Sequence, residues 1–419
     1  MLDEDIRAQI RRARGLFAAM VVAYALGVFN DNFFKQVAVL KAQYGGMRWL
    51  KGLALGLFAL PYLLFSAYAG WLADRFPKRN IIIGTKIWEL AAMLTGAVGV
   101  LTGSWVLIIA MVFMMGFQSA VFGPALNGSI PELYPASYVT QANATLKVFT
   151  TVAILLGMVV AGWLLSIEGV LFGQPIKHVI VASVAVVVSL MGVGASLGVP
   201  RRRAADPAVR FPLAGPVDTI RHLAALREDR PLLRTVFADM YVWGIGALQL
   251  IIIPGIGERQ FGMNEAVSSN LMFAMLVGIA IGGMLAPRLA RGAKWHRVLV
   301  PSATAIGLLA LAAPAVMLLP RGVALWVMAA LLGLLGVAGG LFMIPCESFV
   351  QVRPRPERKG TVIAATNFGI FAGIVLAGGL SMALDEVLTP TTFMALTAAV
   401  SIPVAVWLRL SLRKEADAE

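Results

Sequence analysis

Long, unbroken runs of apolar residues recur along the whole chain, and polar residues gather in the short segments between them. Each run is about 20 residues long, the length of a helix that crosses the hydrocarbon core of a bilayer. Apolar and polar positions do not alternate as they do in the strands of a membrane barrel. We therefore predict an all-α membrane protein with twelve transmembrane helices, over residues 16–40, 50–73, 81–101, 105–124, 141–165, 179–199, 232–254, 267–289, 298–319, 323–344, 362–384 and 392–412.

The composition supports a lipid environment. Of the 419 residues, 59% are hydrophobic and 14% are charged, whereas soluble domains carry roughly 45–50% apolar and about 25% charged residues. A soluble core of this length is too small to bury the surplus. The single cysteine, Cys346, and three scattered histidines show no metal-ligand spacing. We expect neither a metal nor another cofactor.

The basic residues that give the net charge of +13 border the apolar runs and do not gather on a soluble module. We therefore expect no nucleic-acid partner. Twelve spans place both termini on one side of the membrane. That side holds 26 of the lysines and arginines in the loops, tails and adjoining span ends, and the opposite side holds six. Because positive residues are retained on the cytoplasmic side, we predict that both termini are cytoplasmic.

A polar linker, residues 200–231, divides the chain into two predicted six-helix bundles, residues 1–199 and 232–419. Short motifs recur in both bundles, since residues 283–288 echo residues 70–75 and residues 342–345 echo residues 122–124. Such internal repeats are typical of secondary transporters. Within the linker, residues 217–226 are compatible with an amphipathic helix on the anionic membrane surface and equally with a solvated segment.

The segment after the second span carries a compact motif of small and charged residues: Gly70, Asp74, Arg75, Lys78 and Arg79. It resembles the G-x-L-A-D-R-x-G-R/K-R/K signature of the major facilitator superfamily. The glycine allows a close helix approach, and the acid suits the positive end of another helix. The resemblance implies the major facilitator fold and a cytoplasmic latch between its halves. Pro77 replaces a glycine of the signature, and Pro287 replaces the acid of the second copy, so one latch is expected. The alternative is a charged turn that only sets topology.

An ionisable side chain inside a span costs roughly 2.5–3.5 kcal/mol to insert into the membrane, so it needs a partner or a water-filled cavity. Such side chains are therefore the candidate functional residues. With the amides beside them, they are Asn30, Asp31, Asn32, Lys35, Lys86, Glu89, Asn143, Lys147, Asp239 and, just past the tenth span, Glu347. In the first and third spans an acid and a lysine lie four or three residues apart, on one helix face. Either these pairs brace their helices as ion pairs, or they form a pocket of both signs that suits a zwitterion. For Lys147 and Asp239, a gating salt bridge and a ligand contact remain equal alternatives.

Residues 29–35, Phe-Asn-Asp-Asn-Phe-Phe-Lys, resemble the F-x-D-N-x-x-K stretch of bacterial lysophospholipid transporters. Further matches follow in order at residues 73–78, 85–89, 122–125, 128–133, 142–144, 153–157 and 342–345 and at Gln351. Gln249 departs from the family, whose members often carry a basic residue near this position. The resemblance implies a monomeric transporter that flips lysophospholipids, such as lysophosphatidylethanolamine, from the outer to the inner leaflet of the bacterial inner membrane by alternating access. It also implies a separate acyltransferase/acyl-ACP synthetase that re-acylates the cargo.

With this resemblance in view, we predict that the substrate is bound by Asn30, Asp31, Asn32, Lys35, Lys86, Glu89, Asn143 and Lys147. We predict that gating involves Gly70, Asp74, Arg75, Lys78, Arg79 and Asp239.

Three alternatives lead to different functions. A major facilitator exporter of another amphiphile or drug would share the fold and differ in cargo. A membrane acyltransferase would need an H-x4-D motif, but the residues five positions after the three histidines are Ser183, Arg227 and Pro301, so we do not expect an enzyme. A non-transporting scaffold would have no need of Asp31 and Lys35 inside the membrane.

Overall fold

The computed structural model describes residues 4–44, 50–171, 173–263, 265–290, 292–384 and 387–416. Twelve helical segments of these residues are long and apolar enough to cross a membrane, which confirms the predicted all-α membrane architecture. The helices are α1 (Glu4–Tyr44), α2 (Leu50–Arg75), α3 (Lys78–Thr102), α4 (Trp105–Leu133), α5 (Ala136–Leu165), α6 (Ile176–Leu197), α7 (Pro216–Ala225), α8 (Arg230–Gly255), α9 (Glu265–Leu289), α10 (Leu299–Val316), α11 (Arg321–Val352), α12 (Lys359–Leu384), α13 (Pro390–Leu396) and α14 (Ala398–Ala416). A two-stranded hairpin, β1 (Val170–Leu171) and β2 (Gln174–Pro175), joins α5 to α6.

Several helices extend beyond the predicted spans, and two of these extensions follow from local chemistry. Helix α1 begins at Glu4 and not at residue 16, because the polar tail is helical and has Glu4 and Asp5 in its first turn, where acids favour the positive end of a helix. Helix α4 continues to Leu133, past Pro124 and Pro131. Proline is tolerated inside membrane helices because neighbouring groups satisfy the freed backbone carbonyls.

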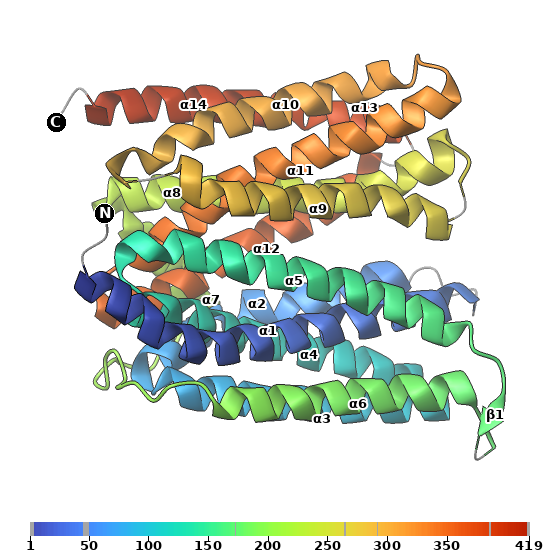
Figure 1. The fold of residues 1–419 in the computed structure, drawn as a ribbon, viewed down its shortest axis with the longest axis horizontal. Coiled ribbons are helices and arrows are strands. Elements are labelled where there is room, and N and C mark those ends of the chain that lie inside the picture. The colour runs from blue at the N-terminus through green and yellow to red at the C-terminus, as the bar shows by residue number, and fades with distance from the viewer. Residues whose placement is uncertain are drawn as a thin grey trace. The chain divides into compact units, whose positions relative to one another are not determined.

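The first compact unit comprises Met1–Ala136, Phe149–Arg230 and Gln351–Phe368. Within it α2 packs on α4, α4 on α3, and α3 on α6, which runs beside it in Figure 1. Aromatic and methionine side chains form its core: Phe33, Phe34, Met93, Met111 and Met115. Residues 30–35 of α1, called the polar segment of this helix below, include Phe33 and Phe34 of this core.

The second compact unit comprises Ser137–Val148, Pro231–Val350 and Gly369–Glu419. Helices α10 and α14 run side by side within it (Figure 1). Glycines bring α9 and α11 into backbone contact, because a Cβ on Gly278 or Gly336 would overlap a carbonyl oxygen of the other helix. Such small-residue crossings are typical of membrane helices. Since α5 and α12 each contribute to both units, the predicted division at residues 199 and 232 remains a prediction.

Candidate functional site

The side chains in the polar segment of α1 make different kinds of contact. Asn30 is fully buried, and its Nδ2 donates hydrogen bonds to the Ala185 carbonyl (3.2 Å) and to Ser189 Oγ (2.9 Å) of α6. Asn32 donates to the Val28 carbonyl of its own helix at 2.8 Å. The amide nitrogens of both residues thus donate to protein groups, and Asn30 links α1 to α6. The charged members, Asp31 and Lys35, and the unbonded Oδ1 of Asn30 remain for a ligand.

Asp31 and Lys35 do not pair with each other in the part of the chain that the structure describes. The Lys35 ammonium lies 4.3 Å from the centre of the Phe58 ring on α2, in a cation–π contact. Asp31 Oδ2 lies 3.2 Å from Ser119 Oγ of α4, and its buried Oδ1 has no hydrogen-bond partner among the described residues. The two charges still act on each other electrostatically, so the two roles considered for this pair, a helix brace and part of a ligand pocket, both remain predictions. Two opposite charges are held near each other by different neighbours.

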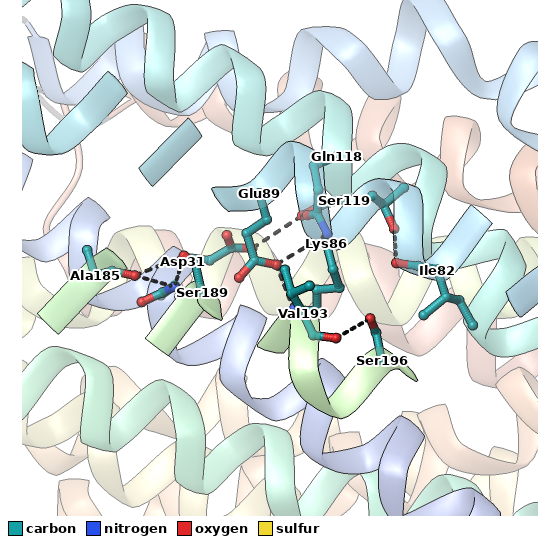
Figure 2. A network of polar contacts seen from close by, with 12 residues as sticks. Asp31, Ile82, Lys86, Glu89, Gln118, Ser119, Ala185, Ser189, Val193 and Ser196 are labelled. Carbon is teal, nitrogen blue, oxygen red and sulfur yellow. Dashed lines mark hydrogen bonds and ion pairs between the residues drawn. The ribbon is translucent and has the colours of Figure 1, made fainter. Parts of the chain in front are cut away.

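A chain of polar contacts runs from Asp31 through α4 to α3 (Figure 2). The Ser119 hydroxyl can donate its single proton to Asp31 Oδ2 or to Gln118 Oε1, which lies 3.0 Å away. Gln118 Nε2 donates to Glu89 Oε2 over 3.4 Å. Gln118 and Ser119 were not predicted as site residues, because neither is ionisable and their contacts with Asp31 and Glu89 depend on the packing of α4 against α1 and α3. Their adjacency within an otherwise apolar span was the one available signal.

Lys86 and Glu89 form the ion pair that their spacing predicts. Lys86 Nζ lies 2.6 Å from Glu89 Oε2, and each side chain is 1% exposed. Gly27 of α1 makes room for the pair, because a Cβ there would lie 2.6 Å from Lys86 Nζ. Such a pair is sensitive to the loss of either partner, since the remaining charge would be buried alone.

Three buried acceptor oxygens of this region have no hydrogen-bond partner within the described ranges: Asn30 Oδ1, Asp31 Oδ1 and Glu89 Oε1. A buried acceptor left unbonded costs about 1–3 kcal/mol. A ligand that carries several N–H donors would remove this cost. The arrangement therefore favours a cationic donor such as an ammonium group.

A second polar cluster lies within the other unit, on α5, α8 and α11. Lys147 Nζ lies 3.6 Å from Met343 Sδ and 4.8 Å from the centre of the Trp243 ring. Asp239 and Glu347 both act electrostatically on this lysine. Asn143, predicted as a substrate ligand, donates to Ser348 Oγ over 3.0 Å. The structure brings these predicted residues together, and their roles in binding or gating remain predictions.

Asp74 of the signature motif caps a helix. It is fully buried at the end of α2, and its Oδ1 accepts a hydrogen bond from the Gly360 amide at 2.7 Å. Its Oδ2 accepts from the amide (2.8 Å) and hydroxyl (2.7 Å) of Thr361. These donors belong to the first turn of α12, where a carboxylate is favoured. Gly70 permits the approach, because a Cβ there would lie 2.8 Å from Thr361 Cα.

The three basic residues of the motif differ in their contacts. Lys78 is buried and pairs with Glu132 Oε1 of α4 at 2.5 Å. Arg79 donates to the carbonyls of Val199 (2.8 Å) and Leu197 (2.9 Å) and so caps the end of α6. Arg75 is half-buried and takes no part in these bonds.

Replacing Asp74 by asparagine is expected to loosen the start of α12, because hydrogen bonds to a carboxylate are about twice as strong as neutral ones. We expect hydrogen exchange at the Gly360 and Thr361 amides to accelerate about tenfold or more. Asp218→Asn, the same change at a carboxylate of the linker helix α7, is the control and should leave these amides unchanged. Wild-type exchange rates in Asp74→Asn would refute the capping role.

Comparison with known proteins supports this architecture. A sequence model described as the Major Facilitator Superfamily matches residues 15–378. The chain is similar to the curated protein named Lysophospholipid transporter LplT from Salmonella paratyphi A, and to its namesake from Salmonella typhimurium. Each is 27% identical over 386 residues, which cover 90% of both chains.

Solved structures show the same fold. The human organic anion transporter MFSD10 (TETRAN) superposes with a TM-score of 0.75 at 14% identity, over 94% of this chain and 99% of that one. A bacterial homologue of the iron transporter ferroportin in the outward-facing state gives 0.74 at 12% identity, over 96% and 99%. The transporter FucP in the outward conformation gives 0.73 at 14% identity, over 94% and 98%. At these identities the likeness establishes the fold alone.

Proposed function

The chain belongs to the major facilitator superfamily, and from its similarity to proteins named lysophospholipid transporters we propose that it moves lysophospholipids from the outer to the inner leaflet of the bacterial inner membrane. It is a multi-pass membrane transporter and not an enzyme. Alternating access of a polar site inside the bilayer is the mechanism that fits repeats of this kind. The excess of basic residues on one side supports cytoplasmic termini.

The observation that carries the proposal is the pair of separated charges on α1. Asp31 offers a buried oxygen that no described residue binds, and the Lys35 ammonium lies over the Phe58 ring, close enough to Asp31 for the two charges to act on each other. The headgroup of lysophosphatidylethanolamine carries an ammonium and a phosphate. The ammonium fits Asp31, and the phosphate fits Lys35. The surrounding apolar helices suit the single acyl chain.

The relatives support the same cargo. Proteins named lysophospholipid transporters match 90% of the chain. A monomer is the simplest assembly for this fold. An acyltransferase that re-acylates the cargo on the inner side would trap it and draw transport inward, so we include such a partner in the proposal.

Uptake of labelled lysophosphatidylethanolamine into proteoliposomes tests the proposal directly. The full-length protein should raise the inward rate well above that of protein-free vesicles, and fully acylated phosphatidylethanolamine should be a poor substrate. The same vesicles should be assayed with a panel of amphiphilic drugs. Drug movement without lysolipid movement would overturn the proposal in favour of an exporter of another amphiphile.

A further inference from the structure

The linker between the sixth and seventh spans is folded onto the end of α2 (Leu50–Arg75). The Asp206 amide donates to the backbone carbonyl of Asp74 at 2.9 Å. The Trp71 indole N–H donates to the Val209 carbonyl at 3.3 Å. The Phe211 ring packs edge-on against Trp71, with the ring centres 5.0 Å apart. These contacts distinguish the linker from a solvated coil and fix which of its side chains face outward.

The outward side of the linker is strongly basic. Six of its arginines are exposed: Arg201, Arg202, Arg203, Arg210, Arg221 and Arg227. Arg221 pairs with Asp218 at 3.0 Å. Of the other acids of the linker, Asp206 accepts from the Ala208 amide and Asp229 pairs with Arg353, while Glu228 is exposed next to Arg227. Most of this positive charge is therefore uncompensated by the residues that the structure describes.

Apolar side chains stand among these arginines. Phe211 is 51% exposed, and Leu213 is 89% exposed. On α7 (Pro216–Ala225), Val217 and Ile220 are half exposed and lie three residues apart on one helix face, while Thr219 points inward and is buried. Exposed apolar groups bordered by arginines are the pattern of a segment that lies in a membrane interface.

Histidine does not contribute to this charge at neutral pH. Burial lowers the pKa of His222 on α7 below its ordinary value, although Asp218 acts in the opposite direction. An imidazole whose pKa lies below the usual value of about 6.5 is mainly neutral at pH 7. The attraction of this face for anions therefore comes from arginine and should persist at alkaline pH.

We propose that this linker surface, formed by Arg201, Arg202, Arg203, Arg210, Phe211, Leu213, Val217 and Ile220, binds anionic phospholipid headgroups of the adjoining leaflet. The geometry favours a membrane over a soluble acidic partner, because the linker leaves one span at Leu197 and enters the next at Arg230. Both of its ends are thus held at the bilayer boundary. The arginines bind the phosphates, and the apolar side chains enter the interface between headgroups and acyl chains.

The single native cysteine provides a clean probe of this proposal. Cys346 is fully buried, so a cysteine introduced by Val217→Cys can be labelled selectively with an environment-sensitive fluorophore. The full-length labelled protein is placed in nanodiscs of phosphatidylcholine, with or without added phosphatidylglycerol. We expect blue-shifted emission with phosphatidylglycerol, and reversal of the shift at high salt, which screens exposed charges.

Two triple variants with equal loss of charge test whether the site is local. In Arg201→Gln/Arg202→Gln/Arg203→Gln, the phosphatidylglycerol content needed for half of the shift should rise about tenfold or more. Arg7→Gln/Arg11→Gln/Arg12→Gln changes exposed arginines of α1 and should leave the titration unchanged. Circular dichroism confirms that both variants are folded.

Three results would overturn the proposal. The emission could be the same with and without phosphatidylglycerol, which would mean that no lipid binds. Both triple variants could lose the shift equally, which would indicate attraction by net charge without a site. Inorganic phosphate added to phosphatidylcholine nanodiscs could reproduce the shift, which would assign the surface to a free anion.

Discussion

Asp31→Asn is expected to reduce lysophosphatidylethanolamine uptake about thirtyfold while the protein stays folded. The asparagine keeps the shape of the side chain and an oxygen that can accept from Ser119, so the local packing survives. It removes the negative charge that we assign to the ammonium of the cargo. Loss of one partner from a buried charge pair costs about 2–5 kcal/mol, and the lower limit corresponds to about thirtyfold.

Uptake and thermal stability should be measured on the same purified samples. Asp31→Glu, which keeps the charge, is expected to retain more uptake than Asp31→Asn. Asp218→Asn makes the same chemical change on the linker and should transport normally. If a well-folded Asp31→Asn protein takes up lysolipid at the wild-type rate, the carboxylate is not part of the binding site.

Lys86→Met is expected to destabilise the fold by about 3–5 kcal/mol, because it leaves the Glu89 carboxylate buried without its cation. The double variant Lys86→Met/Glu89→Leu removes both charges and should recover most of the lost stability. Hydrophobic replacement of a whole buried pair is often neutral or stabilising. The midpoint of thermal unfolding in detergent measures both effects.

The same two variants decide between the two roles left open for this pair. If the double variant recovers both stability and uptake, the pair only braces α3. If it recovers stability without uptake, the pair also contacts the cargo. Equal instability of the single and double variants would mean that the energetic account of the pair is wrong.

The spans were predictable because the bilayer fixes their length and removes competing structures. The ends of the helices were less predictable. Proline signals the end of a helix in water, yet α4 continues through Pro124 and Pro131. The polar tail before the first span shows no apolar periodicity, although it is helical from Glu4.

The site was predictable where its contacts are local. Lys86 and Glu89 sit three residues apart on one helix, and the spacing alone gave their contact. The spacing of Asp31 and Lys35 is just as suggestive, but Lys35 instead meets the Phe58 ring of another helix. Contacts between helices depend on packing that one sequence does not reveal. Ser119 was missed for the same reason.

The location of Lys86 and Glu89 on a single helix has a consequence for the electrical character of the transporter. Moving one elementary charge across a membrane potential changes the energy by about 2.3 kcal/mol for each ~100 mV. Lys86 and Glu89 lie 2.6 Å apart on α3 and travel together whenever that helix moves. Their charges cancel, so a tilt of α3 carries a small dipole and no net charge through the field. This pair therefore places two ions in the protein interior without adding net charge that the membrane potential could act on.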